Sequence, residues 1–385
     1  MNVPNTPARR VIVAGGGIGG LAAAVALTRR GLDVTVVERA DGIRELGAGI
    51  TIQINGMRAL DRLGVADAVA ARGSVIARAG IRTWRGDLLS ADPLDRLAAE
   101  YGSPCVGVHR GRLQAALLAA VPAGVVRLGA AVADVAETAD GVTVRLDDGT
   151  RLRGDVLVGA DGLHSTVRAR LHGPAEPDYA GYTIWRAVCP TPPGLGADEI
   201  GVYWGPSCRF GFVPISATET YWYATQVQPY DADAEPDPLP GLRARHRDWA
   251  APVPALLAGT DPGAVFRTPI TDREPLDRWG RGRVTLLGDA AHPMTPNLGQ
   301  GCCQALEDAV TLADVLAGAP DPAAALRRYE DLRAPRTARI VRMARDLGRR
   351  GHTPDGWREA LDAADKPLDE DARRWLYAPD TVGAG

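Results

Sequence analysis

Lysine is almost absent from this chain of 385 residues. The 44 basic residues include a single lysine, Lys366, near the C-terminus. Schiff-base, P-loop and other active-site lysine chemistry is therefore excluded, unless the C-terminal tail folds into the site.

Cysteine is also scarce, and its five residues are scattered along the chain. They form no Cys-x-x-Cys motif, and the six histidines form no His-x-x-x-His motif. We therefore expect neither a disulfide framework nor a metal site. The adjacent Cys302 and Cys303 are interpreted as small packing residues at the start of a helix.

Long apolar runs and a strong excess of one charge are missing too. No stretch of about 18 apolar residues could span a membrane, and the first ten residues lack the apolar core of a secretory signal. With a net charge of −3, the chain lacks the excess of basic residues with which nucleic-acid-binding proteins contact phosphates. We expect a cytoplasmic protein that does not span a membrane or bind nucleic acid, with a length sufficient for two domains.

The clearest positive signal is a glycine-rich turn that follows the apolar run 11–14. Gly15, Gly17 and Gly20 occupy the glycine places of a G-x-G-x-x-G fingerprint. The first allows a tight turn, the second lets the backbone approach a pyrophosphate, and the third lets helix and strand pack closely. Glu38 follows the next strand-like run, Asp33–Val37, where a ribose hydroxyl needs an acceptor. These residues predict a bound dinucleotide, with its phosphates at a helix N-terminus that begins near Gly19.

Two further apolar runs end in turns of small residues. The run 155–158 precedes Gly159-Ala160-Asp161-Gly162, and the run 283–287 precedes Gly288-Asp289-Ala290-Ala291-His292-Pro293. Either aspartate alone has an ordinary alternative as a turn or N-cap residue. The fingerprint upstream favours a cofactor role for both.

These three motifs, in this order, resemble those of the single-component FAD-dependent aromatic monooxygenases, such as salicylate hydroxylase, zeaxanthin epoxidase and FAD-dependent urate hydroxylase. The resemblance covers about residues 9–340. It implies that Asp161, with Ser165 and Arg168 after it, lies near the FAD pyrophosphate and the incoming NAD(P)H. It also implies that Asp289 holds ribityl or ribose hydroxyls.

The same resemblance supplies further candidate FAD contacts. Arg110 and Gln114 match an Arg and a Gln on the ribityl-phosphate side. The run 296–301 resembles the turn into a helix that faces the flavin ring, although its glycines have the alternative of being plain loop residues. The remaining expected contacts are Ile18, Gly19, Arg39, Gly49, Pro296, Leu298, Gly299, Gln300 and Gly301. The family's aromatic-Pro-Asn pattern is replaced here by Gln53-Ile54-Asn55.

The implied reaction is NAD(P)H-dependent insertion of one oxygen atom from O2 into an aromatic or heteroaromatic small molecule, through a flavin hydroperoxide. No second fingerprint is present, so NADPH or NADH is expected to bind transiently over the flavin. The protein is expected to be a monomer or homodimer. The alternative is a flavoprotein oxidase or dehydrogenase without oxygen transfer. Halogenation is not expected, because the related flavin halogenases depend on a lysine beside the substrate.

The predicted fold class is α/β, with a Rossmann-like FAD-binding domain interleaved with an antiparallel-sheet substrate domain and followed by C-terminal helices. The FAD-binding domain is expected in residues 1–75, 105–175 and 275–335. Residues 76–104 and 176–272 are expected to form the substrate sheet, because aromatic and β-branched residues are concentrated in 176–272. Residues 336–385 are expected to be a helical segment.

Three polar residues are candidates for catalysis. Arg209 lies in an apolar strand-like run, and Tyr221 follows twelve positions later, a spacing that resembles the urate hydroxylases. The alternative for Arg209 is a structural tie between sheet and FAD domain. His292 is a candidate base or proton relay, with a positioned loop histidine as its alternative.

Arginine recurs at every third place in the helical stretch around Pro335. We expect a solvated helix face there, with a membrane or partner surface as the alternative. The residues concerned are Arg333, Arg336, Arg339, Arg342 and Arg345.

Overall fold

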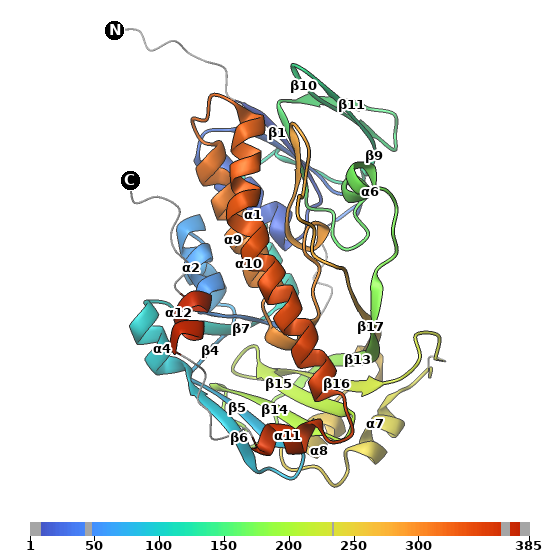
Figure 1. Ribbon diagram of the computed structural model, residues 1–385. Coiled ribbons are helices and arrows are strands. Elements are labelled where there is room, and N and C mark those ends of the chain that lie inside the picture. Colours follow the sequence, from blue (N-terminus) through green and yellow to red (C-terminus); the bar gives the residue numbers. More distant parts are fainter. Residues whose placement is uncertain (1–8, 43–47, 233–234, 363–369, 378–385) are drawn as a thin grey trace.

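The computed structural model describes residues 9–42, 48–232, 235–362 and 370–377 (Figure 1). Lys366, the one lysine, lies outside the described residues. No helix in the described part of the chain is both long enough and apolar enough to cross a membrane.

The first layer is a five-stranded parallel sheet with the strand order β18-β12-β1-β2-β8. Its strands are almost continuous apolar runs, as expected for a sheet that is covered on both faces. Helices α1 (Ile18–Arg29), α5 (Arg110–Ala120) and α9 (Gly301–Leu316) pack together beside it. The strands are β1 (Arg10–Ala14), β2 (Asp33–Val37), β8 (Val126–Arg127), β12 (Val156–Gly159) and β18 (Val284–Leu286).

The second layer is a seven-stranded sheet with the order β17-β13-β16-β15-β14-β5-β6. Every pair in it is antiparallel except β14 with β5. Both predicted sheet segments, 76–104 and 176–272, contribute strands. These are β5 (Arg78–Thr83), β6 (Leu88–Pro93), β13 (Asp178–Pro190), β14 (Glu199–Gly205), β15 (Cys208–Pro214), β16 (Glu219–Val227) and β17 (Phe266–Asp272).

The two faces of this sheet have different coverings. The back face carries Trp185, Phe210 and Trp222, which pack under α7 (Leu239–Arg245) and α8 (Val253–Ala258). The front face carries the alternate residues, and β15 and β16 contact β3 (Gly49–Ile52), which belongs to a separate small sheet. The strand register therefore places one set of side chains against α7 and α8 and the alternate set on the face that borders the candidate site.

Two small sheets and several short helices complete the body. One sheet joins β3, β7 (Cys105–His109) and β4 (Ser74–Ile76), and the other joins β9 (Val132–Thr138), β10 (Gly141–Leu146) and β11 (Arg151–Gly154). The short helices are α2 (Ile54–Leu63), α3 (Ala66–Ala70), α4 (Leu94–Tyr101) and α6 (Thr166–His172).

The C-terminal part is dominated by one long helix, α10 (Pro322–Gly351), which runs from the parallel-sheet layer to the seven-stranded sheet (Figure 1). It is followed by α11 (Gly356–Asp362) and α12 (Glu370–Tyr377). The predicted domain boundary between residues 335 and 336 is wrong, because α10 continues through Pro335. The predicted fold class, a Rossmann-like layer with an antiparallel-sheet layer and C-terminal helices, is confirmed.

Candidate functional site

The three sequence motifs meet at one edge of the parallel sheet. β1 lies between β2 and β12, and β18 is the other neighbour of β12. Because these strands are parallel, the turns after β1, β12 and β18 all leave the same carboxyl edge. This edge is where ligands bind in open α/β sheets.

Each of the three fingerprint positions has a different structural reason to be glycine. Gly15 has φ +107°, and a Cβ there would overlap the carbonyl oxygen of Ala160. A Cβ on Gly20 would overlap the carbonyl oxygen of Gly15, so Gly20 permits the close approach of α1 to the turn. A Cβ on Gly17 would meet no atom within 4 Å. Gly17 therefore faces open space at the N-terminus of α1, where a pyrophosphate fits.

Glu38 and Gln114 hold the fingerprint turn from two sides. The Gly16 N–H donates to Glu38 Oε2 at 2.6 Å, and the Ala40 N–H donates to Glu38 Oε1 at 2.9 Å. Gln114 Nε2 donates to the Gly16 carbonyl oxygen at 2.8 Å. Both predicted residues thus lie beside the phosphate turn, and the exposed Arg39 follows Glu38.

Asp161 has the contacts of a helix-capping residue. Its carboxylate accepts from the Ser165 hydroxyl and from the N–H groups of Thr166 (2.8 Å) and Val167 (3.2 Å), at the start of α6. Ser165 is the N-cap residue of α6, and Asp161 is a residue of the preceding turn whose carboxylate accepts the first helix N–H groups, so these contacts support its ordinary alternative as a turn residue. Asp161 and Gly162, which has φ +81°, lie in the segment between β12 and α6, so α6 follows the carboxyl edge where the three motifs meet.

Asp289 differs, because its side chain is exposed. It lies in the short 3-10 turn η2 (Gly288–Ala290), whose Gly288 has φ +61°. The Gly288 N–H donates to Asp308 Oδ2 at 3.0 Å, which fixes the turn from below. Arg110, also exposed, begins α5 and interacts electrostatically with Asp289. Asp289 and Arg110 are thus available to polar groups of a cofactor.

The run 296–301 forms the predicted turn into a helix. The 3-10 turn η3 (Pro296–Leu298) ends at Gly299, which has φ +64°, and α9 begins at Gly301. No side chain caps α9, so its first N–H groups remain available to an acceptor. The Gln300 side chain is buried and donates to Gln53 Oε1 at 2.7 Å, so its contacts are internal.

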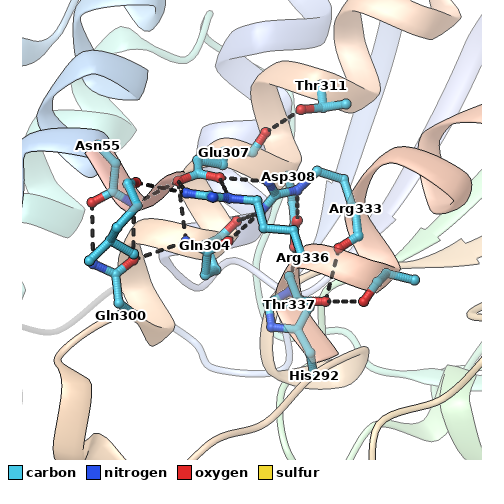
Figure 2. Close-up of polar contacts among 12 residues, drawn as sticks. Asn55, His292, Gln300, Gln304, Glu307, Asp308, Thr311, Arg333, Arg336 and Thr337 are labelled. Atoms are coloured by element: carbon cyan, nitrogen blue, oxygen red, sulfur yellow. Dashed lines mark hydrogen bonds and ion pairs between the residues drawn. The ribbon is translucent and has the colours of Figure 1, made fainter. Parts of the chain in front are cut away.

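A buried ion network lies behind this turn, between α9 and α10 (Figure 2). Arg333 pairs with Glu307 at 2.6 Å and with Asp308 at 2.7 Å, and Arg336 pairs with Glu307 at 2.8 Å. Asn55 Nδ2 donates to Glu307 Oε1 at 2.6 Å and to Gln300 Oε1 at 2.9 Å. The network therefore connects α10, α9 and the start of α2.

The expected solvated arginine face is wrong for part of the row. Arg333 is 4% exposed and Arg336 is half-buried, because Arg333 pairs with Glu307 and Asp308 and Arg336 pairs with Glu307. Arg339 stacks on Trp375 with Cζ 4.0 Å from the ring centre, and Arg345 pairs with Asp272 at 2.9 Å. Only Arg342 lies simply on the exposed side.

His292 belongs to the same network and is buried. Its Nε2 lies 2.6 Å from Asp308 Oδ2, and its side chain is 1% exposed. Its ring packs 5.2 Å from that of Trp279. The catalytic assignment of His292 is therefore replaced by its alternative, a positioned loop histidine.

The front face of the seven-stranded sheet combines aromatic rings with two arginines. Strand register places Arg209 opposite Trp204 and Thr225, and Arg186 opposite Tyr223. Tyr221 lies on the same face, directly against Gly49, where any Cβ would overlap the Tyr221 side chain. The tyrosine is 8% exposed, and burial raises the pKa of its phenol. Gly49 thus acts by allowing Tyr221 to approach β3.

Arg209 is buried at the junction of three elements. Its Nη1 donates to Asn297 Oδ1 at 3.1 Å, its Nη2 donates to the Leu347 carbonyl oxygen at 2.6 Å, and its Cζ lies 3.9 Å from the Trp204 ring centre. Burial lowers the pKa of its guanidinium to about 10. It contacts no carboxylate within the described ranges, and its Nε has no partner. These contacts are those expected of the alternative, a structural tie between the sheet and the FAD domain. They leave the positive charge of the Arg209 guanidinium without a carboxylate partner among the described residues.

Sequence reasoning missed Asp308, Asn297 and Asn55. Asp308 lies inside an apolar helical stretch, and a charged residue at a buried helical position is itself a signal that a partner is needed. Asn55 stands in the segment that departs from the family pattern, and Asn297 lies inside the predicted flavin turn. No local pattern indicated which side chains they would meet.

Replacement of Asp308 by Asn should strongly destabilise the protein. Burial disfavours the charged carboxylate, but His292 and Arg333 outweigh it and lower the pKa of Asp308 to about 2. Breaking a buried pair leaves an uncompensated charge, so Asp308→Asn should cost roughly 3–5 kcal/mol at neutral pH in denaturant unfolding. The contribution is present above the ordinary carboxyl pKa of about 4 and is lost as pH falls toward 2.

The matched control is Asp331→Asn on α10, because the Asp331–Arg278 pair is exposed and worth only about 0–1 kcal/mol. An Asp308→Asn variant with the stability of this control would contradict the assigned role. So would a stability deficit that grows as the pH is lowered from 4.

Replacement of Asp289 by Ala should weaken cofactor binding without harming the fold. Charge-assisted hydrogen bonds contribute about 1.5–3 kcal/mol, so the Kd for FAD should rise roughly ten-fold or more. Fluorescence titration of apoprotein measures this Kd, and the melting temperature of the apoprotein should stay unchanged because Asp289 is exposed. Unchanged FAD affinity would show that Asp289 is only a turn residue.

Comparison with known proteins agrees with this geometry. The family described as FAD binding domain matches residues 8–344. The aurachin C monooxygenase/isomerase of Stigmatella aurantiaca is 46% identical over 341 residues, which cover 89% of each chain. The 6-hydroxynicotinate 3-monooxygenase of Bordetella bronchiseptica is 36% identical over 379 residues, covering 94% of this chain and 98% of the relative.

Among solved structures, that of Klebsiella pneumoniae HpxO complexed with FAD and uric acid superimposes with a TM-score of 0.89. It is 35% identical and covers 96% of both chains. The chain therefore belongs to the FAD-binding-domain family of single-component FAD-dependent aromatic monooxygenases, the family that its sequence motifs resemble.

Proposed function

We propose that this FAD-dependent monooxygenase uses NAD(P)H and O2 to insert one oxygen atom into an aromatic or heteroaromatic small molecule. The observation that carries the proposal is the 295–301 turn. On one side this turn begins α9 at the motif edge, and on the other its Asn297 contacts Tyr182 and Arg209 of the aromatic face. A single turn thus joins a dinucleotide site to a face suited to a flat ring.

The residues of the motif edge fit FAD. The open space at Gly17 suits the pyrophosphate, Glu38 suits the ribose of the adenosine, and exposed Asp289 suits hydroxyl groups. The uncapped start of α9 suits an electron-rich carbonyl edge, because its N–H groups and dipole favour negative charge. When bound, FAD supplies hydride acceptance from NAD(P)H and the activation of O2.

The front sheet face would receive the substrate. Tyr182, Tyr223 and Trp204 provide apolar ring surface that excludes water, which a reactive oxygen donor requires. Arg209 would orient an anionic or carbonyl-bearing substrate, because its charge meets no carboxylate among the described residues. Tyr221, beside β3, would contact the substrate from the other end. Relatives named for uric acid and for 6-hydroxynicotinate support a heteroaromatic substrate class.

A pocket beside α6 supports the use of a nicotinamide dinucleotide. It has a volume of about 180 Å³, opens beside α6, and includes Arg168, Arg273 and one carboxylate, Glu176, in its lining. Burial and the nearby Arg273 lower the pKa of Arg168 to about 10, and Arg273 Nε has no partner. Two arginines without a carboxylate partner in the described chain fit the phosphates of transiently bound NAD(P)H.

Isotope labelling tests the proposed reaction directly. The purified protein should contain FAD rather than FMN, since Glu38 suits the adenosine ribose that FMN lacks, and mass analysis of the released flavin checks this. A screen of phenols and nitrogen heterocycles should find compounds that stimulate NAD(P)H oxidation without equivalent peroxide release. Their products should carry one atom from ¹⁸O2. Oxidised product without label would favour the alternative, an oxidase or dehydrogenase.

Replacement of Arg273 by Ala should weaken the nicotinamide nucleotide selectively. Loss of one charge-assisted contact should raise the KM for NAD(P)H roughly ten-fold, with FAD affinity unchanged. Steady-state oxidation of NADPH and of NADH measures this effect. Arg278→Ala is the control, because Arg278 is an exposed arginine of the same segment paired with Asp331. An unchanged KM in Arg273→Ala would remove the pocket from the proposal.

A further inference from the structure

Two glycines form a notch near the C-terminal end of α10. Gly348 and Gly351 are both buried and lie three residues apart, on one side of the helix. A Cβ on Gly348 would lie 2.6 Å from Asn297 Nδ2. A Cβ on Gly351 would overlap the guanidinium of Arg209. The side chains of Asn297 and Arg209 therefore occupy the space where these two residues would carry side chains.

The notch also exposes two helix carbonyl groups. Asn297 Nδ2 donates to the Ala344 carbonyl oxygen at 3.2 Å, and Arg209 Nη2 donates to the Leu347 carbonyl oxygen at 2.6 Å. Each acceptor lies four residues before one of the glycines. A helical side chain covers the turn N-terminal to its own Cα, so glycine uncovers the carbonyl group one turn earlier. Each glycine thus provides both the space and the acceptor for one inserted side chain.

The inserted side chains are joined to one another and to the site. Arg209 Nη1 donates to Asn297 Oδ1 at 3.1 Å, and Asn297 Nδ2 also donates to the Tyr182 hydroxyl at 2.8 Å. Asn297 belongs to η3, two residues before Gly299. Displacing either side chain from the notch would therefore move the turn that leads into α9.

A purely structural helix would gain from alanine at these positions. Glycine destabilises a helix relative to alanine, because it loses more conformational freedom on folding. The pair therefore makes physical sense where a backbone surface must accept other groups closely. The His352 ring beside the notch is stacked on Tyr182 at 3.8 Å, and its Nδ1 lies 2.7 Å from the Gly348 carbonyl oxygen. Tyr182 and His352 thus form a closely packed pair beside the notch.

We propose that the Gly348/Gly351 notch of α10 is a positioning element for the active site. It holds the Arg209 side chain and, through Asn297, sets the position of the 295–301 turn beside the cofactor. The proposal rests on the proposed function, because it places FAD at that turn. Gly348 and Gly351 act only through the two side chains that they admit, so they are positioning residues.

The test compares helical glycine-to-alanine variants. Gly351→Ala and Gly348→Ala should raise the Kd for FAD about ten-fold, equivalent to one charged hydrogen bond, and change the visible circular dichroism of the bound flavin. The control is Gly241→Ala in α7, where a Cβ would meet only the end of the Glu235 side chain at 3.4 Å. Gly241→Ala should leave both flavin readouts unchanged, and apoprotein melting confirms that each variant is folded.

A double variant separates positioning from general damage. Arg209→Ala empties the space at Gly351, so Gly351→Ala added to Arg209→Ala should cause no further change in FAD Kd or flavin spectrum. Additive effects of the two substitutions would overturn the proposal, and so would normal flavin readouts in Gly351→Ala. If Gly351→Ala does not fold, a folded double variant with the Arg209→Ala phenotype supports the proposal, and an unfolded double variant contradicts it.

These readouts require neither substrate nor NAD(P)H. Failure to find a labelled oxygenation product would therefore count against the proposed function and leave the flavin measurements standing. Unchanged flavin readouts in Gly351→Ala would count against the notch and leave the proposed oxygenation untouched.

Discussion

The pairing of Glu307 and Asp308 with Arg333 and Arg336 is the interaction on which the site depends. Each ion loses hydration worth several kcal/mol when buried, and the arrangement is tolerable only because every carboxylate oxygen has a partner. Asp308 fixes the Asp289 turn through the Gly288 N–H, and Glu307 reaches the start of α2 through Asn55. The network therefore fixes the Asp289 turn relative to the start of α2 from beneath, where no solvent weakens it.

The motif edge could be predicted because its requirements are local. A tight turn, a close helix approach and an open phosphate site each demand glycine at a fixed place, and Gly15, Gly20 and Gly17 satisfy them. The alternation of small, apolar and aromatic residues likewise indicated the sheet between residues 176 and 272. In each of these segments, a residue's own backbone or immediate neighbours decide its role.

The ion network and the arginine junction could not be predicted in the same way. Positions three apart on a helix drift around its axis, so Arg333 faces the core whereas Arg342 faces solvent. Which carboxylate meets Arg333 depends on how α9 packs against α10, which spacing does not encode. The same holds for His292, whose partner Asp308 lies on the following helix. For Arg209, the apolar run predicted the strand but not the approach of α10, which determines the contacts of its guanidinium.

Helix α10 acts on the 295–301 turn from two directions. Its N-terminal half holds α9 through charge, and its C-terminal half contacts Asn297 and Arg209 through backbone carbonyl groups. Pro335 lies within the charged part of the helix, between Arg333 and Arg336, and both of these arginines pair with Glu307. A turn held at both ends by one helix can shift only if that helix bends or slides. The position of the 295–301 turn relative to the aromatic face is therefore set by the packing of α10.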